Sequence, residues 1–234
     1  MLADKIISFN KSLDFTGNLP VGIRIMNPFR ESAEALRVST LFYRKYFNDN
    51  EPRHLILGIN PGRFGGGITG IPFTDPKRLI SDCNIPFSGT MAHEPSSVFV
   101  YEMIAKFGGP DLFYKKFLIS AVSPLGFTSS TKSGREINYN YYDSNELQLA
   151  VHDFILESMN QQLTFGINAD KCFCLGTGKN YKFLMRLNAV HRFFKEIIPL
   201  EHPRYVMQYK LKTKHEYITK YLQEFYRTNG HARK

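Results

Sequence analysis

Residues 55–74 read LILGINPGRFGGGITGIPFT, an apolar run that passes into a glycine-rich loop. Leu55 to Leu57 form the apolar run of a buried strand, and Asn60-Pro61-Gly62 ends that strand because proline cannot continue a hydrogen-bonded ladder. The glycine-rich loop that follows suits a place where another group approaches the main chain closely, although a surface turn rich in glycine is the alternative. Ligands of open α/β sheets bind beyond the carboxyl ends of strands, so Asn60 is a candidate functional residue.

Strands and helices alternate on both sides of this loop. The strands are predicted at 53–59, 117–122, 171–175 and 193–198, and the helices at 2–15, 29–48, 75–80, 98–107, 147–165 and 178–190, followed by a last helix. This alternation indicates a mostly parallel sheet covered on both faces. We therefore predict an α/β fold, a three-layer sandwich with a central four-stranded, mostly parallel sheet. The loops after the strands then open on one edge, so Asn60 and His202 are expected to share a cleft.

The length of the chain fits one domain over residues 1–234. Helical segments in residues 1–50 are expected to pack on the sheet, and residues 228–234 to form a flexible basic tail. Residues 126–145, rich in Ser, Thr, Gly, Asn and Tyr, predict a long loop with a functional role. Apolar and polar residues alternate over 205–212, which predicts a strand with one partly basic face.

The composition favours a soluble protein with a polyanionic partner. The formal net charge is +9, and 13 Tyr and 20 Phe could supply surfaces on which bases stack, although most of these rings are expected in the core. The three cysteines, Cys83, Cys172 and Cys174, are too few for a disulfide framework, and the ligands of a zinc or iron–sulfur site are missing. No signal peptide or membrane-spanning run is visible, so we expect a cytoplasmic protein with no membrane association.

Several common enzyme classes are disfavoured by the motifs. The glycines from Gly62 to Gly67 lack the G-x-G-x-x-G order of dinucleotide-binding loops. The segment Gly176-Thr177-Gly178-Lys179-Asn180 lacks the first glycine and the Ser or Thr of a phosphate loop, which argues against a nucleoside triphosphatase. No G-x-S-x-G elbow appears, which disfavours an α/β hydrolase of small molecules.

A specific resemblance is carried by the glycine loop itself. The run from Gly58 to Gly65, GINPGRFG, followed by Thr69 to Phe73, TGIPF, resembles the first catalytic motif of the single-strand-selective monofunctional uracil-DNA glycosylases, GMNPGPFG followed by TGVPF. Weaker matches are Asn27-Pro28, Ser123-Pro124-Leu125 against C-P-L, and His202-Pro203 against H-P-S. The resemblance implies the uracil-DNA glycosylase fold and hydrolysis of the bond between a deaminated base and deoxyribose.

The resemblance also implies roles for individual residues. Asn60 would position the attacking water, Phe73 would stack on the flipped base, and His202 would stabilise the departing base. Asp75 is a further catalytic candidate because an acid stands at the corresponding place in the family, but capping of a helix that begins at Pro76 is an equal alternative. The expected base-binding residues are Gly58, Ile59, Gly62, Phe64, Phe73, Ala121 and Ser123. Neither a metal nor an organic cofactor is required.

Two departures from the family bear on specificity and DNA binding. Ala121 stands where the family reads uracil with an asparagine, so xanthine and hypoxanthine are expected as substrates beside uracil. Arg204-Tyr205 replaces the family's S-P-R, and either residue could be the wedge that fills the gap left by a flipped base. The proposed DNA contacts are Arg63, Ser129, Ser130, Thr131, Lys132, Lys179, Arg204 and Tyr205.

We therefore predict a monofunctional DNA glycosylase that acts as a monomer on single- or double-stranded DNA containing deaminated bases. The competing hypothesis is a non-catalytic single-stranded nucleic-acid-binding protein that retains the base pocket.

Overall fold

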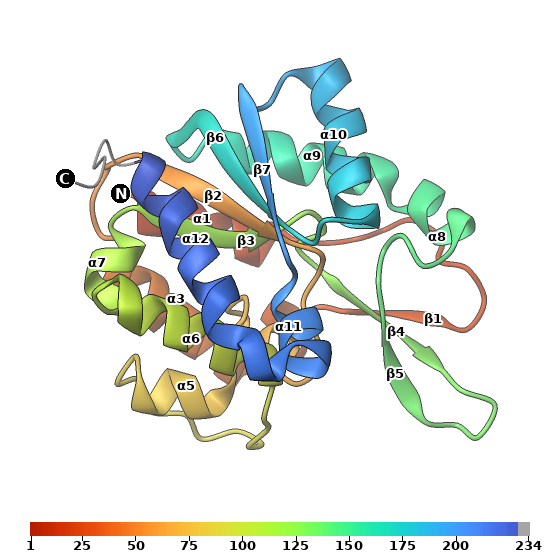
Figure 1. Ribbon diagram of the computed structural model, residues 1–234. Coiled ribbons are helices and arrows are strands. Elements are labelled where there is room, and N and C mark those ends of the chain that lie inside the picture. Colours follow the sequence, from red (N-terminus) through yellow and green to blue (C-terminus); the bar gives the residue numbers. More distant parts are fainter. Residues whose placement is uncertain (229–234) are drawn as a thin grey trace.

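The computed structural model describes residues 1–228 and is built around a four-stranded sheet (Figure 1). The strand order is β3-β2-β6-β7, and every neighbouring pair is parallel. The strands are β2 (Arg53–Gly58), β3 (Phe117–Ala121), β6 (Ile167–Leu175) and β7 (Glu196–Leu200). The prediction of an α/β fold with a central four-stranded parallel sheet is confirmed.

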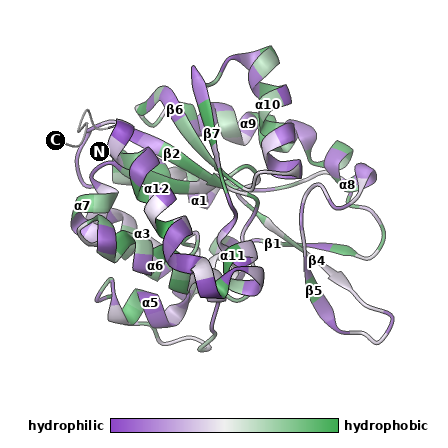
Figure 2. Cartoon of the chain, in the orientation of Figure 1, coloured by the Kyte–Doolittle hydropathy of each residue, from purple (hydrophilic) through white to green (hydrophobic). Residues whose placement is uncertain are grey.

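Helices cover both faces of this sheet because the side chains of a strand alternate between the two faces. Phe117 of β3 contacts Phe225 of α12 (Lys214–Thr228) at a ring-centroid distance of 4.6 Å. Ser120, of opposite parity on the same strand, donates a hydrogen bond to Gln162 of α9 (His152–Leu163). Figure 2 shows hydrophobic residues concentrated along the central strands between these helices.

The remaining helices complete the layers and the connections. They are α1 (Leu2–Ser12), α2 (Pro28–Glu31), α3 (Ala33–Tyr46), α4 (Gly66–Thr69), α5 (Pro76–Ser81), α6 (Pro95–Phe107), α7 (Pro110–Tyr114), α8 (Asn145–Ala150), α10 (Lys179–His191), α11 (Pro203–Tyr209) and the 3-10 turn η1 (Leu211–Thr213). The helix predicted over 29–48 is divided at Ser32, whose extended backbone and hydroxyl cap the amino end of α3. The helix predicted over 147–165 is likewise divided at Val151.

The prediction of a long loop over 126–145 is wrong. Strands β4 (Gly126–Ser130) and β5 (Glu136–Tyr139) form a hairpin and, with β1 (Ile23–Met26), a second sheet that is antiparallel with the order β1-β4-β5. The hairpin turns at Gly134, which has a φ of +78°, and the Thr131 N–H donates to the Arg135 carbonyl. Many polar residues of this segment, such as Ser130, Lys132 and Arg135, are exposed on the hairpin, whereas Thr128 is buried.

The prediction of a strand over 205–212 is also wrong. His202 caps α11 and Pro203 occupies its first turn, where a fixed φ favours the start of a helix. Val206 is fully buried on the inner face of α11, whereas Tyr205 and Tyr209 are exposed. The apolar–polar alternation arose because this short helix places few residues in the core.

The remaining expectations on the chain concern its termini and membranes. The proposed tail lies almost entirely outside the described residues, since Thr228 ends α12. Among residues 1–228, no helix is long and apolar enough to cross a membrane.

Candidate active site

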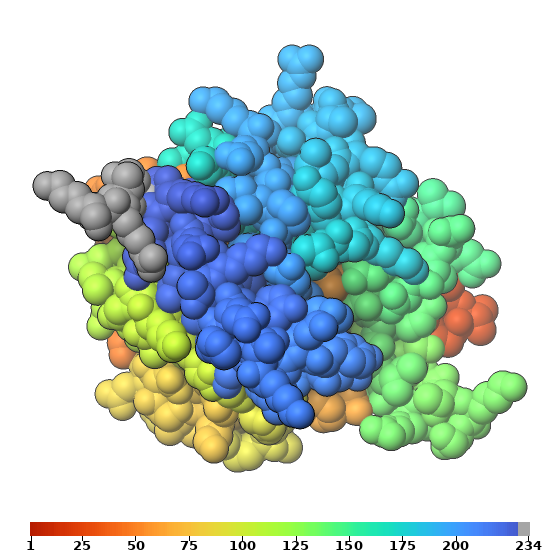
Figure 3. Space-filling model, viewed as in Figure 1, coloured from red at the N-terminus to blue at the C-terminus, as the bar shows by residue number. Residues whose placement is uncertain are grey.

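A cavity of about 240 Å³ opens where β2, β3 and β7 end. Figure 3 shows the face on which the α11–α12 segment, in deep blue, lies next to the β4–β5 region, in green. The predicted residues that line the cavity are Gly58, Ile59, Asn60, Gly62, Phe73, Ala121, His202, Arg204 and Tyr205. Asn60 and His202 therefore share one cavity although they are distant in sequence.

The side chain of Asn60 is held by main-chain atoms of the segment that follows β5. Its Oδ1 accepts a hydrogen bond from the Tyr141 N–H at 3.2 Å, and its Nδ2 donates to the Tyr139 carbonyl at 3.3 Å. The antiparallel sheet approaches this closely because Gly126 lacks a side chain: a Cβ there would lie 2.5 Å from the Pro61 carbonyl oxygen. The orientation of the Asn60 amide is thus set by a distant part of the chain.

His202 is oriented by its own helix. Its Nδ1 accepts a hydrogen bond from the Arg204 N–H at 3.1 Å, so the neutral ring carries its proton on Nε2. Burial, with a smaller contribution from the Arg204 guanidinium, lowers the pKa of His202 to about 3. The imidazole is therefore neutral at physiological pH and offers an Nε2–H donor.

Phe73 lies beside His202, with a ring-centroid distance of 5.6 Å. Its backbone has a φ of 53°, a conformation that a non-glycine residue adopts at a cost of about 1–3 kcal/mol. Gly58 admits the Phe73 ring, because a Cβ at Gly58 would lie 2.9 Å from it. The Thr69 hydroxyl holds the turn from within by donating to the Thr74 carbonyl at 2.7 Å.

Glu94 is a buried carboxyl in the cavity wall that the sequence did not reveal. The helix predicted over 98–107 begins earlier, at Pro95, so Glu94 stands directly before α6. The carboxyl enters space left by motif glycines: a Cβ would lie 2.8 Å from its Oε1 at Gly62 and 2.1 Å from its Oε2 at Gly65. Sequence spacing carries no signal for this contact across the loop.

Asp75 does not line the cavity. Its buried carboxylate caps α5 by accepting from the Arg78 N–H at 2.9 Å, and it also accepts from the Glu94 N–H at 2.9 Å. The contacts of Asp75 are therefore those of a helix cap. Asp75 also accepts from the Glu94 main chain, and it does not face the cavity.

The other predicted residues lie around the cavity or away from it. Phe64 is 42% exposed beneath the Arg63 guanidinium, which is 4.1 Å from its ring centroid, and it borders an adjoining cavity. Ser123 is fully buried and donates to the Leu125 carbonyl, so it does not line the base cavity. Lys179 is the first residue of α10, and its Nζ lies 5.9 Å from the centroid of the Tyr142 ring. Ser129 and Ser130 end β4, and Thr131 and Lys132 follow in the hairpin turn.

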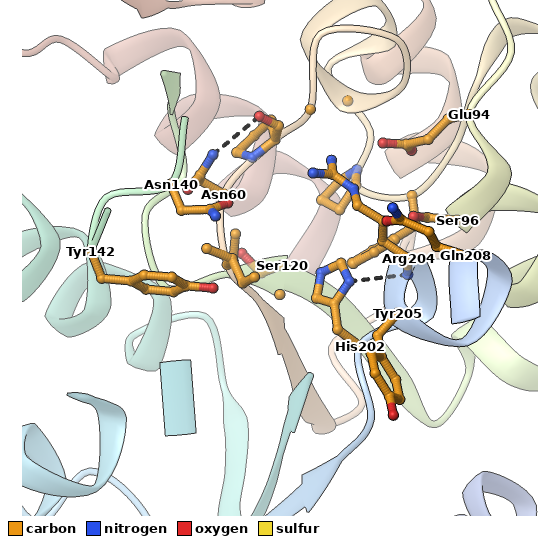
Figure 4. Close-up of a pocket in the computed structure, with 18 of the residues that line it drawn as sticks. Asn60, Glu94, Ser96, Ser120, Asn140, Tyr142, His202, Arg204, Tyr205 and Gln208 are labelled. Atoms are coloured by element: carbon orange, nitrogen blue, oxygen red, sulfur yellow. Dashed lines mark hydrogen bonds between the residues drawn. The ribbon is translucent and has the colours of Figure 1, made fainter. Parts of the chain in front are cut away.

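Several lining residues were missed because the start of α6, the helix α11, the end of β3 and the segment after β5 meet at the cavity only in the folded chain. These are Glu94, Ser96, Ser120, Asn140, Tyr142, Gln208 and Tyr209. Figure 4 shows Asn60, Asn140 and Tyr142 on one side of the cavity, and Glu94, Ser96, Arg204 and Gln208 on the other. Among residues 1–228, no group of three or more His, Cys, Asp or Glu side chains is arranged to hold a metal ion.

Comparisons with known proteins agree with this geometry. The sequence profile of the uracil DNA glycosylase superfamily matches residues 44–226. Among solved structures, the chain is similar to the crystal structure of wild-type SMUG2 from Pedobacter heparinus, with 61% sequence identity and a TM-score of 0.95 over 97% of this chain and 98% of that one. A search of curated proteins found no match. The family match covers most of the chain, and the chain belongs to the uracil DNA glycosylase superfamily.

Proposed function

We propose that this protein is a monofunctional DNA glycosylase that hydrolyses the N-glycosidic bond of deaminated bases in DNA. One observation carries the proposal: Asn60 and the neutral His202 follow two different strands and line one cavity that also contains Phe73. A water-positioning amide, a donor for the leaving base and a ring for stacking are the groups that such a hydrolysis needs.

In the proposed reaction, the target base leaves the DNA stack, enters the cavity and stacks on Phe73. A carbonyl oxygen has two lone pairs, so Asn60 Oδ1 can accept from a water molecule while it also accepts from the Tyr141 N–H. As the bond between base and sugar breaks, the sugar becomes cationic and the base anionic. His202 donates a hydrogen bond from its Nε2–H to the anionic base, and the water oxygen bonds to the sugar carbon that the base has left. The proton that the water loses is taken up, through solvent, by the base anion, which departs as the neutral base.

The proposed substrates are uracil and, because Ala121 cannot form a side-chain hydrogen bond, xanthine and hypoxanthine. Ala121 lines the cavity at the end of β3, and its methyl group cannot form a hydrogen bond with the edge of a base. An enzyme discriminates weakly between two bases when it forms no hydrogen bond to the atoms by which those bases differ.

Of the proposed DNA contacts, Arg204 and Tyr205 of α11 line the cavity. Tyr205 and Tyr209 are exposed on α11 with 43% and 65% of their surface accessible, and both also line the cavity. Either ring suits a wedge that fills the gap left by the flipped base. Arg63, Arg204 and Lys179, with the hairpin residues 129–132, would hold phosphates without reading sequence.

The test is release of uracil, xanthine and hypoxanthine from labelled oligonucleotides, detected by alkaline cleavage of the abasic product. We expect wild-type protein to release at least one of these bases, and Asn60→Ala and His202→Ala to be slower by about a hundredfold to a thousandfold. Glu146→Gln, at an exposed position of α8, is the matched control and should behave as wild type. Salt-dependent DNA binding without any abasic product would instead support the non-catalytic binding protein.

A further inference from the structure

The carboxyl of Glu94 lines the cavity in which the proposed reaction takes place. Glu94 is 9% exposed and lies across from Asn60 (Figure 4). Because Gly62 and Gly65 have no side chains, the two carboxyl oxygens occupy the space beside the glycine loop. The cavity wall next to the Gly62 backbone is thus completed by a group from the start of α6.

The surroundings of this carboxyl favour its protonated form near neutral pH. Burial raises the pKa of Glu94 to about 7, and the charge of Asp75 acts in the same direction. The Arg204 guanidinium and the Ser97 hydroxyl, which donates to Oε2 at 3.2 Å, oppose this effect only in part. Two further basic groups pack against the Asp75 carboxylate: Arg78 and His93.

Polar side chains on the opposite side of the cavity include Asn60, Asn140 and Tyr142, and the Asn140 Nδ2 donates to Asp143 at 3.3 Å. The Asn60 Nδ2 donates to the Tyr139 carbonyl, and the Ser120 hydroxyl donates its proton to Gln162 Oε1. Ala121 offers no polar side-chain atom. A protonated Glu94 carboxyl supplies a hydrogen-bond donor on the side of the cavity formed by the glycine loop and the start of α6.

We propose that Glu94 is a specificity-determining residue whose protonated carboxyl donates a hydrogen bond to N7 of a flipped deaminated purine. A purine presents the N7 acceptor at the edge where a pyrimidine presents only carbon, so this donor favours xanthine and hypoxanthine over uracil. The inference rests on the proposed glycosylase function and adds to it a residue and a preference among the proposed bases.

The test compares single-turnover release of xanthine, hypoxanthine and uracil by wild type, Glu94→Ala, Glu94→Gln and the control Glu146→Gln. Glu94→Ala should slow purine release by about tenfold to a hundredfold, the effect of one lost hydrogen bond at a buried site, and uracil release by less than about threefold. Thermal unfolding of each variant checks that the fold is retained.

The pH dependence separates base contact from a purely structural role. Wild-type purine release should fall as the pH rises through about 7, because the ionised carboxyl cannot donate. Glu94→Gln donates through its amide at any pH, so it should retain purine release and lose this decline. Both proteins are compared on the same base. Ionisation of the base therefore affects both pH profiles equally and does not contribute to the difference between them.

Three results would overturn the inference. They are release of uracil but of neither purine by wild type, an equal loss for all bases in Glu94→Ala, and a wild-type pH profile in Glu94→Gln. Failure of wild type to release any base is a different result, since it would remove the glycosylase function itself.

Discussion

The two residues at the centre of the proposed chemistry are held in contrasting ways. Asn60 is oriented by main-chain atoms of Tyr139 and Tyr141, about 80 positions later in the chain and at the end of the antiparallel sheet. His202 is oriented by the N–H of Arg204, two positions away on its own helix. The position of Asn60 therefore depends on how two sheets meet, whereas that of His202 depends on one helix cap.

The largest expected effect comes from changing the group that the antiparallel sheet holds. Asn60→Asp replaces the Nδ2 donor with an oxygen that faces the Tyr139 carbonyl, so one hydrogen bond is lost and two oxygens repel each other. We expect base release to fall by about a hundredfold to a thousandfold, as when a preorganised group is removed. Single-turnover kinetics measure the loss. A variant with the wild-type rate would show that the hydrogen bond from Asn60 to the Tyr139 main chain is not needed for base release.

A smaller effect is expected from loosening the junction between β5 and the glycine loop. The Arg63 N–H donates to Asn138 Oδ1 at 3.0 Å, so Asn138→Ala removes a contact between the two regions without touching Asn60. We expect base release to slow by about tenfold and stability to fall by about 1 kcal/mol, the contribution of a typical hydrogen bond. Urea denaturation and single-turnover kinetics give the two values. Loss of stability with an unchanged rate would mean that the junction does not position Asn60.

The smallest effect concerns the local support of His202. Its lowered pKa means that the ring is neutral in both states above its ordinary value of 6.5. As the pH falls below 6.5, the unfolded chain binds a proton that the folded chain does not, so stability is lost. Between pH 7 and pH 5, the free energy of unfolding of the wild type should fall by about 1 kcal/mol more than that of His202→Gln, after allowance for solvent screening of this partly exposed residue. Equal losses in chemical denaturation would contradict the lowered pKa.

Much of the parallel half of the molecule could be predicted from the sequence. The strand that ends at Asn60 was visible because apolar residues stop abruptly at Pro61, and the other three parallel strands followed from their alternation with helices. Their ends differ from the prediction by a few residues; β7, for example, spans Glu196–Leu200 rather than 193–198. Local signals sufficed because buried parallel strands are nearly continuous apolar runs.

The hairpin and α11 could not be predicted in the same way. The strands β4 and β5 are short and partly exposed, so their polar side chains resemble those of a loop. The start of α11 depends on a histidine cap, which is uncommon among helix caps, and this signal was outweighed by alternation over 205–212. Both errors concern segments in which local preference is weak and tertiary contacts decide the structure.

The sequence by itself determined the α/β fold, the strand end at Asn60, and the motif that links Gly58, Asn60 and Phe73 with His202. These features depend on burial patterns and chain breakers that act over a few residues. Only the tertiary structure decided which way the Asn60 amide points, which nitrogen of His202 carries the proton, and that Glu94 completes the cavity wall. The Asn60 amide and the Glu94 carboxyl depend on groups brought together across sheets and loops, and the His202 proton depends on a helix cap that exists only once α11 has formed. No pattern of residue types along the chain encodes these contacts.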